Sequence, residues 1–291
     1  MNRLWLSRFR RYLQRRNFSR YTVRNYLHAL AMFLRAVGKK RPEAVTEQDV
    51  ARYIELLQAQ RLVAKTINGR LSAIRQFYEF IKRDYNSESI NPVRSWDFLK
   101  EPRPLPGAAN EEDLIRFFSQ IRSLRDRALC FVLLRSGLRV SEAVGLEVRD
   151  VDLRRQALKV RLGKNQRERQ VYLSNDTVSV LWKYLAQRGW PEQGRLFVSE
   201  KGTTLHQSLS VRGVQKRMET YARRAGVQIN CHMLRHTMAT QLLNQGVRLV
   251  VIQELLGHSK VETTQRYARL VNRRVREEYF AGMNKIVDNT K

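Results

Sequence analysis

The chain has 291 residues, enough for two domains of ordinary size, and its 55 Lys and Arg against 27 Asp and Glu leave a net charge of +28 shared between both halves. A surplus this large predicts a polyanionic partner that both domains contact. The sequence lacks an apolar run of about 18 residues that could span a membrane, the apolar core of a secretory signal and a framework of paired cysteines, so we expect a cytoplasmic protein with no membrane partner.

Residues 4–82 repeat apolar side chains at spacings of three and four, which predicts consecutive amphipathic helices. A break at residues 38–42 is followed by Thr46, which can cap the helix that begins after it. The fourth helix begins near Ala64, and its polar side carries Lys65, Asn68, Arg70 and Arg75. Taken alone, such a basic stripe is more often a solvated helix face than a binding surface.

Periodicity fails between residues 91 and 109, where four of the six prolines stiffen the chain. This pattern predicts an extended interdomain linker. We place the first domain at residues 1–100, the Pro-rich linker at 101–109 and the second domain at 110–291.

The second domain is predicted to be mainly helical with one small β-hairpin. Asn110 and the acids that follow it suit a helix N-terminus, and Gly137 ends a buried helix before the next one begins. Apolar and polar residues alternate over 157–162 and 169–173, on either side of a polar turn. Helical periodicity then returns from residue 178 and continues over 211–225, 232–245, 249–256, 261–270 and an amphipathic segment at 271–283.

Five short pieces of the second domain combine residues with catalytic potential: Arg139 after a glycine break, Lys164 in the hairpin turn, the HMLRH run, His258 after Gly257, and Tyr267. Each has an ordinary alternative, such as a surface ion pair for the arginine or a core position for the tyrosine. The pair His232 and His236 has the spacing of a zinc half-site, but the glutamate that the metalloprotease motif places after the first histidine is a methionine here. Singly, none of the pieces establishes a function.

In combination, GLRVSEAVGL, GKNQRER, HMLRH and LGHSKVETTQRYA resemble the tyrosine site-specific recombinases of the phage integrase and Xer type, in that family's order and spacing. The segments TVRNYLHALAMFL and TINGRLSAIRQFYEF are similar to the family's helical, SAM-like core-binding domain. The resemblance covers essentially the whole chain. It implies a mainly α fold in which a helical DNA-clamping domain precedes an α+β catalytic domain with a small hairpin or sheet.

The resemblance implies an active site of six residues: Arg139, Lys164, His232, Arg235, His258 and Tyr267. Tyrosine would attack a phosphodiester to form a 3′-phosphotyrosyl link, which conserves bond energy, so that rejoining needs neither ATP nor metal. Two arginines can hold the non-bridging oxygens, which gain negative charge in the transition state. His232 would accept the tyrosine proton, Lys164 would protonate the leaving 5′ hydroxyl, and His258 would donate to the phosphate.

Glu142 and His236 are expected to support this site by orienting active-site groups. In the light of the resemblance, we assign Lys65, Asn68, Arg70 and Arg75 to DNA binding, with most other cations meeting phosphates without reading sequence. The implied partner is duplex DNA with an inverted-repeat core site, bound by a dimer and exchanged in a tetrameric synapse. Residues 271–283 would pack on a neighbouring subunit, or fold back on their own domain.

The sequence departs from the family pattern at three places, and two other functions are compatible with its charge or its chemistry. Asn165 and Tyr172 stand where Xer-like members usually have glycine and proline, and Ala268-Arg269 replaces the common Thr-His. A catalytically inactive DNA-binding or architectural factor could keep the charge, and a type IB topoisomerase would share the tyrosine chemistry. Whether a second recombinase or an accessory DNA-bending protein takes part is open, as is the choice between integration or excision of a mobile element and resolution of DNA.

Overall fold

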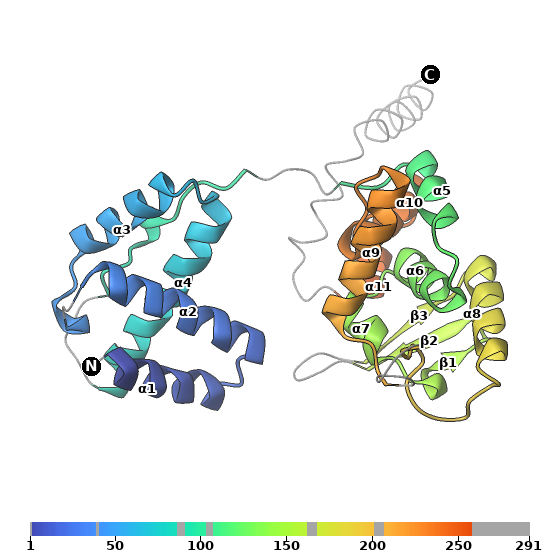
Figure 1. Ribbon diagram of the computed structural model, residues 1–291, viewed down its shortest axis with the longest axis horizontal. Helices are drawn as coiled ribbons and strands as arrows, with labels where there is room; N and C mark the ends of the chain where they lie inside the picture. Colours follow the sequence, from blue (N-terminus) through green and yellow to red (C-terminus); the bar gives the residue numbers. More distant parts are fainter. Residues whose placement is uncertain are drawn as a thin grey trace, which may run out of the picture. The chain divides into compact units, whose positions relative to one another are not determined.

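The computed structural model describes residues 2–38, 41–85, 91–102, 107–161, 168–200 and 207–257. The chain divides into two compact units, Met1–Arg103 and Pro104–Lys291 (Figure 1). Within the described residues, no helix is both long enough and apolar enough to cross a membrane. Lys164, His258, Tyr267 and the predicted helices at 261–270 and 271–283 lie outside the described residues.

The first unit is helical, as predicted. Its helices are α1 (Asn2–Arg15), α2 (Arg20–Ala36), α3 (Glu47–Ala59) and α4 (Ala64–Asp84), with 3-10 turns at Pro42–Ala44 and Ser95–Asp97. Ser19 caps α2, and Thr46 caps α3 in a reciprocal pair of hydrogen bonds with Asp49. The apolar face of α4 packs on α2 and supplies the centre of the core through Ile67, Leu71, Ile74, Phe77 and Ile81.

The segment after α4 packs on the first unit, which corrects the expectation of an extended linker from residue 91. Val93 is buried, and Phe98 and Leu99 pack against the core of this unit. The Asn68 amide donates to the Leu99 carbonyl and accepts from its N–H, at 2.9 Å in each case. Proline content indicated an extended chain, but it carried no information about the apolar side chains that dock here.

The second unit combines helices with one antiparallel sheet. The helices are α5 (Glu111–Ser119), α6 (Leu124–Ser136), α7 (Val140–Gly145), α8 (Asn175–Gln187), α9 (Val211–Ala225), α10 (Cys231–Asn244) and α11 (Leu249–Leu256). The sheet has the order β1 (Val151–Asp152), β2 (Ala157–Val160) and β3 (Arg169–Tyr172). The predicted hairpin is present as β2 and β3, with Leu158 opposite Val171, whereas β1 was too short to show a periodic signal.

Helix α6 lies at the centre of the second unit, between α8 and α10 (Figure 1). Its buried residues occupy most sides of the helix, as expected for a helix enclosed by its neighbours, and Ala128, Val132 and Leu133 are fully buried. Gly137 ends the helix in a left-handed conformation at φ 62°. A Cβ atom there would lie 2.9 Å from the Leu256 side chain, so glycine also allows α11 to approach.

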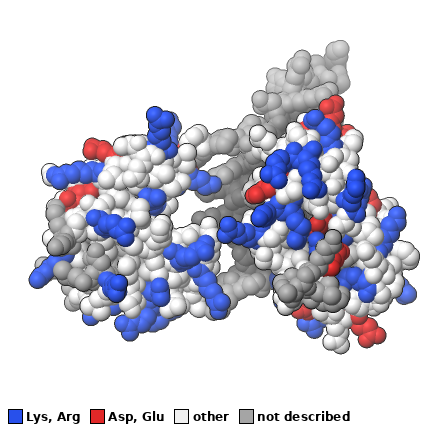
Figure 2. Space-filling model, in the orientation of Figure 1, with Lys and Arg blue, Asp and Glu red and all other residues white. Residues whose placement is uncertain are grey.

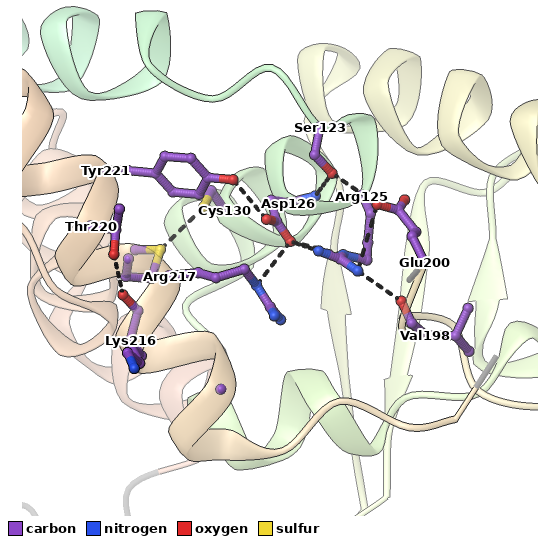
Figure 3. A network of polar contacts seen from close by, with 12 residues as sticks. Ser123, Arg125, Asp126, Cys130, Val198, Glu200, Lys216, Arg217, Thr220 and Tyr221 are labelled. Atoms are coloured by element: carbon purple, nitrogen blue, oxygen red, sulfur yellow. Dashed lines mark hydrogen bonds and ion pairs between the residues drawn. The ribbon is translucent and has the colours of Figure 1, made fainter. Parts of the chain in front are cut away.

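A buried polar network fixes the start of α6 to α9 (Figure 3). Asp126 accepts from Arg125 at 2.8 Å and from the Tyr221 hydroxyl of α9 at 2.8 Å. Arg125 also donates to the Val198 carbonyl, and Arg217 of α9 lies 3.4 Å from the Asp126 carboxylate. Helices α6 and α9 therefore share the Asp126 carboxylate, and Arg125 links the start of α6 to the extended segment at Val198.

Candidate active site

Arg235 projects from α10 into the interior of the second unit and is only 2 % exposed. The helix begins where the Asn230 side chain accepts from the N–H groups of His232 and Met233. The Arg235 guanidinium donates to the Gly137 carbonyl and, from Nη2 at 2.6 Å, to the Leu256 carbonyl. It therefore joins the end of α6 to the end of α11.

Arg139 reaches the same helix end from the start of α7. It is the residue that precedes α7, placed there by the turn at Gly137. Its Nη2 lies 3.4 Å from the Gly257 carbonyl and its Nη1 donates to Glu142 Oε1 at 2.9 Å. Its side chain is 37 % exposed, so part of the guanidinium is open to solvent. Thus the structure brings together the two predicted active-site arginines, Arg139 and Arg235.

Arg169 is a third arginine at this point, and we did not predict a role for it. It lies on β3 and donates through Nε to the Leu255 carbonyl at 2.8 Å. Its two Nη atoms contact both carboxylate oxygens of Glu142, at 3.1 and 2.9 Å. One sequence signal could have found it: Arg169 shares the inward face of the hairpin with Val171 and Leu173, and a charge on an apolar face usually has a buried partner.

Three arginines therefore bind three successive carbonyl groups at the C-terminus of α11: Arg169 at Leu255, Arg235 at Leu256 and Arg139 at Gly257. The negative end of a helix dipole favours cations at this position. Gly257 ends the helix at φ 61°, and a Cβ atom there would lie 2.9 Å from the Arg169 guanidinium. The helix end thus concentrates positive charge at the residue that precedes His258 in the sequence.

Glu142 is the only carboxylate that contacts this arginine cluster in the described part of the chain. Burial raises its pKa, but hydrogen bonds from Arg169 and from the Arg139 backbone, with the charges of both arginines, lower the pKa below its ordinary value overall. The group therefore stays ionised at neutral pH. Glu142 thus lies beside Arg139, and its expected supporting role stays a prediction.

His232 and His236 lie one turn apart on α10, with ring centroids 4.2 Å apart and planes at 77°. His232 is exposed and His236 is half-buried, so the His236 ring supports the side of the His232 ring. Among the described residues, no group of three or more His, Cys, Asp or Glu side chains could hold a metal ion.

The four residues expected to contact DNA do not form one stripe on α4. Lys65 and Arg75 are exposed, but Asn68 is bound to Leu99 and Glu101. Arg70 lies about 140° around the helix from Lys65, next to the phenol of Tyr53. Asn68 thus has a structural role, and only Lys65 and Arg75 present themselves to solvent on that side.

Basic side chains also cover the visible face of both units, where they outnumber acidic ones (Figure 2). Helix α1 alone contains five arginines and no acidic residue. The charge predicted to be shared by both halves is therefore a property of the surfaces that the structure describes. Such surfaces suit a polyanion.

Comparison with known proteins assigns both units. The phage integrase family model matches residues 108–274, and the model of the phage integrase N-terminal SAM-like domain matches residues 5–87. Tyrosine recombinase XerC from Oceanobacillus iheyensis is 33% identical over 95% of this chain and 95% of its own length. Tyrosine recombinase XerA from Pyrococcus furiosus is 30% identical, covering 94% of this chain and 91% of the relative.

Solved structures agree with these sequence matches. The crystal structure of XerA recombinase is 29% identical, has a TM-score of 0.55 and covers 97% of this chain and 99% of its own. The XerH site-specific recombinase, solved with a palindromic difH substrate, has a TM-score of 0.74 at 24% identity over 91% of this chain and 80% of its own, which supports the fold. The chain therefore belongs to the phage integrase family, the site-specific tyrosine recombinases that include the Xer proteins.

Proposed function

We propose that the chain cuts and rejoins duplex DNA through a 3′-phosphotyrosyl intermediate, with Tyr267 as the nucleophile. The observation that carries the proposal is the meeting of Arg139 and Arg235 on adjacent carbonyl groups at the end of α11. In the sequence, His258 follows directly and Tyr267 comes nine residues later. These four residues match the family pattern by type and spacing.

The arginine pair suits a phosphodiester in the transition state of tyrosine attack. As the phenol oxygen bonds to phosphorus, negative charge grows on the non-bridging oxygens, and guanidinium groups can stabilise it through charge-assisted hydrogen bonds. The phenol proton passes to His232, and the bond to the 5′ oxygen breaks as Lys164 protonates that oxygen. Rejoining reverses the steps with a 5′ hydroxyl as nucleophile, so no ATP is consumed.

Duplex DNA is the proposed partner of both units. Exposed Lys65 and Arg75 and the arginines of α1 supply sequence-blind phosphate contacts. The XerH relative was solved on a palindromic substrate, and we extend this to a core site with inverted repeats, a dimer on each site and a tetramer in the synapse. Residues 271–283 are assigned to packing between subunits. The reaction takes place on DNA, in the cytoplasm.

The test uses the full chain and a nicked suicide duplex that carries its recombination site, first located by footprinting DNA that flanks the gene. Wild-type protein is expected to form a covalent adduct that survives denaturation, and Tyr267→Phe is expected to form none. Tyr172→Phe, at an exposed position on β3, is the matched control and should trap DNA normally. An adduct formed by Tyr267→Phe would show that the nucleophile is misassigned.

A second measurement separates the proposed function from its alternatives. A supercoiled plasmid without the site should stay supercoiled, because strand exchange requires two bound sites. Relaxation of that plasmid would indicate topoisomerase activity. Tight binding to the site without any adduct would indicate an architectural factor.

A further inference from the structure

We infer that Arg169 is a positioning residue of this recombinase: it neutralises Glu142, so that Glu142 can orient Arg139 without cancelling the charge that Arg139 presents to the scissile phosphate. The inference rests on the proposed function, because it concerns the arginine pair assigned there to the phosphate. Nothing in the family match itself assigns this residue a role.

The first support is the set of bonds made by Glu142. Its Oε1 accepts from Nη1 of Arg139 at 2.9 Å and from Nη1 of Arg169 at 3.1 Å. Its Oε2 accepts from the Arg139 backbone N–H at 2.8 Å and from Nη2 of Arg169 at 2.9 Å. One carboxylate is therefore shared equally between an arginine that faces solvent and one that does not.

The second support is burial. The side chains of Arg169 and Glu142 are 8% and 7% exposed, whereas that of Arg139 is 37% exposed. Bidentate pairing of a buried guanidinium with a carboxylate satisfies both groups. Arg139 is the member that keeps open surface for an anion. Removal of Arg169 would leave the buried carboxylate with Arg139 as its only charged partner, which would draw that guanidinium inward.

The third support is the anchoring of Arg169 to α11. Its Nε donates to the Leu255 carbonyl, next to the carbonyls bound by Arg235 and Arg139. The absence of a side chain at Gly257 leaves room for its guanidinium. Because Arg169 holds both Glu142 and the helix end, it sets the position of Arg139 relative to Arg235. A displacement of about 1 Å in such a pair can lower a rate by about 10²-fold.

The test compares cleavage rates on two suicide duplexes, one with the normal scissile phosphate and one with a methylphosphonate, which has no negative non-bridging oxygen. Arg169→Met should lose about 10²-fold on the phosphodiester and much less on the methylphosphonate, because only the first substrate needs the charge of Arg139. The ratio of the two rates within one preparation is independent of the folded fraction. Arg169→Lys keeps the positive charge but cannot bind both carboxylate oxygens of Glu142 at once. Its cleavage rate on the phosphodiester should lie between those of wild type and Arg169→Met.

Charge compensation is tested by adding Glu142→Gln to Arg169→Met. The neutral amide no longer competes for Arg139, so the double variant should cleave the phosphodiester at least about tenfold faster than Arg169→Met. Arg161→Met is the matched control, because Arg161, the residue that follows β2, also pairs with carboxylates, Glu147 and Asp150, outside this cluster. It should keep the wild-type ratio between the two duplexes.

Three outcomes would overturn the inference: a wild-type rate for Arg169→Met on the phosphodiester, an equal loss on both duplexes, or no recovery in the double variant. An equal loss would assign Arg169 to general stability. Failure of the proposed function is recognised separately, since Tyr267→Phe would then still form the adduct or wild type would form none, and the inference would fall with it.

Discussion

Arg139 and Arg235 donate to adjacent carbonyl groups of one helix end, Gly257 and Leu256, although one precedes α7 and the other lies on α10. The two side chains differ in burial: Arg235 is enclosed, and Arg139 is partly open. A single helix terminus thus positions an enclosed guanidinium and a partly open one side by side. Because the two side chains differ in burial, we expect their replacement to have different effects on stability.

Replacing these arginines should affect activity and stability in different proportions. Arg139→Ala is expected to lower the cleavage rate by about 10²–10³-fold with a small change in stability. Arg235→Ala should lower the rate similarly and also the free energy of unfolding by several kcal/mol, since it leaves two buried carbonyl groups unpaired at about 1–3 kcal/mol each. Single-turnover cleavage and urea unfolding measure the two quantities. Equal destabilisation by both substitutions would contradict this division.

Asn68 and Lys65 should give opposite phenotypes although both were expected to contact DNA. Asn68→Ala removes the amide that binds Leu99 and Glu101, so it should increase proteolytic cleavage near residues 91–102 and lower stability by about 1–3 kcal/mol. The salt dependence of DNA binding should not change. Lys65→Ala should leave proteolysis unchanged and reduce the slope of log affinity against log salt by about 1. Weaker DNA binding by Asn68→Ala, with proteolysis and stability unchanged, would instead restore Asn68 as a DNA contact.

Local signals in the sequence identified most elements because their causes are local. Thr46 and Asn110 cap helices through neighbouring backbone groups, and both helices begin where expected. The family motifs likewise located Arg139 and Arg235. What the sequence could not show were contacts between distant segments: the docking of Leu99 on Asn68, and the sharing of Glu142 between Arg139 and Arg169. The polar side chains on one side of a helix, or a charged residue in a strand, give the same local sequence pattern whether they face solvent or another segment of the protein.

The ionised state of Glu142 should appear in the pH dependence of stability. Its pKa is lower in the folded protein than in the unfolded chain, so the unfolded state binds more protons between these two values. Its contribution is therefore present above the ordinary carboxyl pKa of about 4.3 and is lost as pH falls through the folded pKa. The difference in unfolding free energy between wild type and Glu142→Gln should shrink on acidification.

The polar network around Asp126 is expected to stabilise the second unit (Figure 3). Asp126→Ala removes the closer carboxylate partner of the buried Arg125 guanidinium and leaves it Glu200 at 3.5 Å, so it should cost up to about 3–5 kcal/mol. Tyr221→Phe removes one hydrogen bond to a charged acceptor and should cost about 1.5–3 kcal/mol. Burial and Asp126 raise the pKa of Tyr221, so its hydroxyl remains a donor through the neutral range.

Combining Asp126→Ala with Tyr221→Phe tests whether these two residues interact. Because both substitutions remove the same hydrogen bond, their combined effect on the urea unfolding free energy should be smaller than the sum of the single effects. Arg116→Ala, which breaks an exposed ion pair with Asp113, is the control and should change stability by less than about 1 kcal/mol. Strict additivity would show that Tyr221 and Asp126 do not interact in solution.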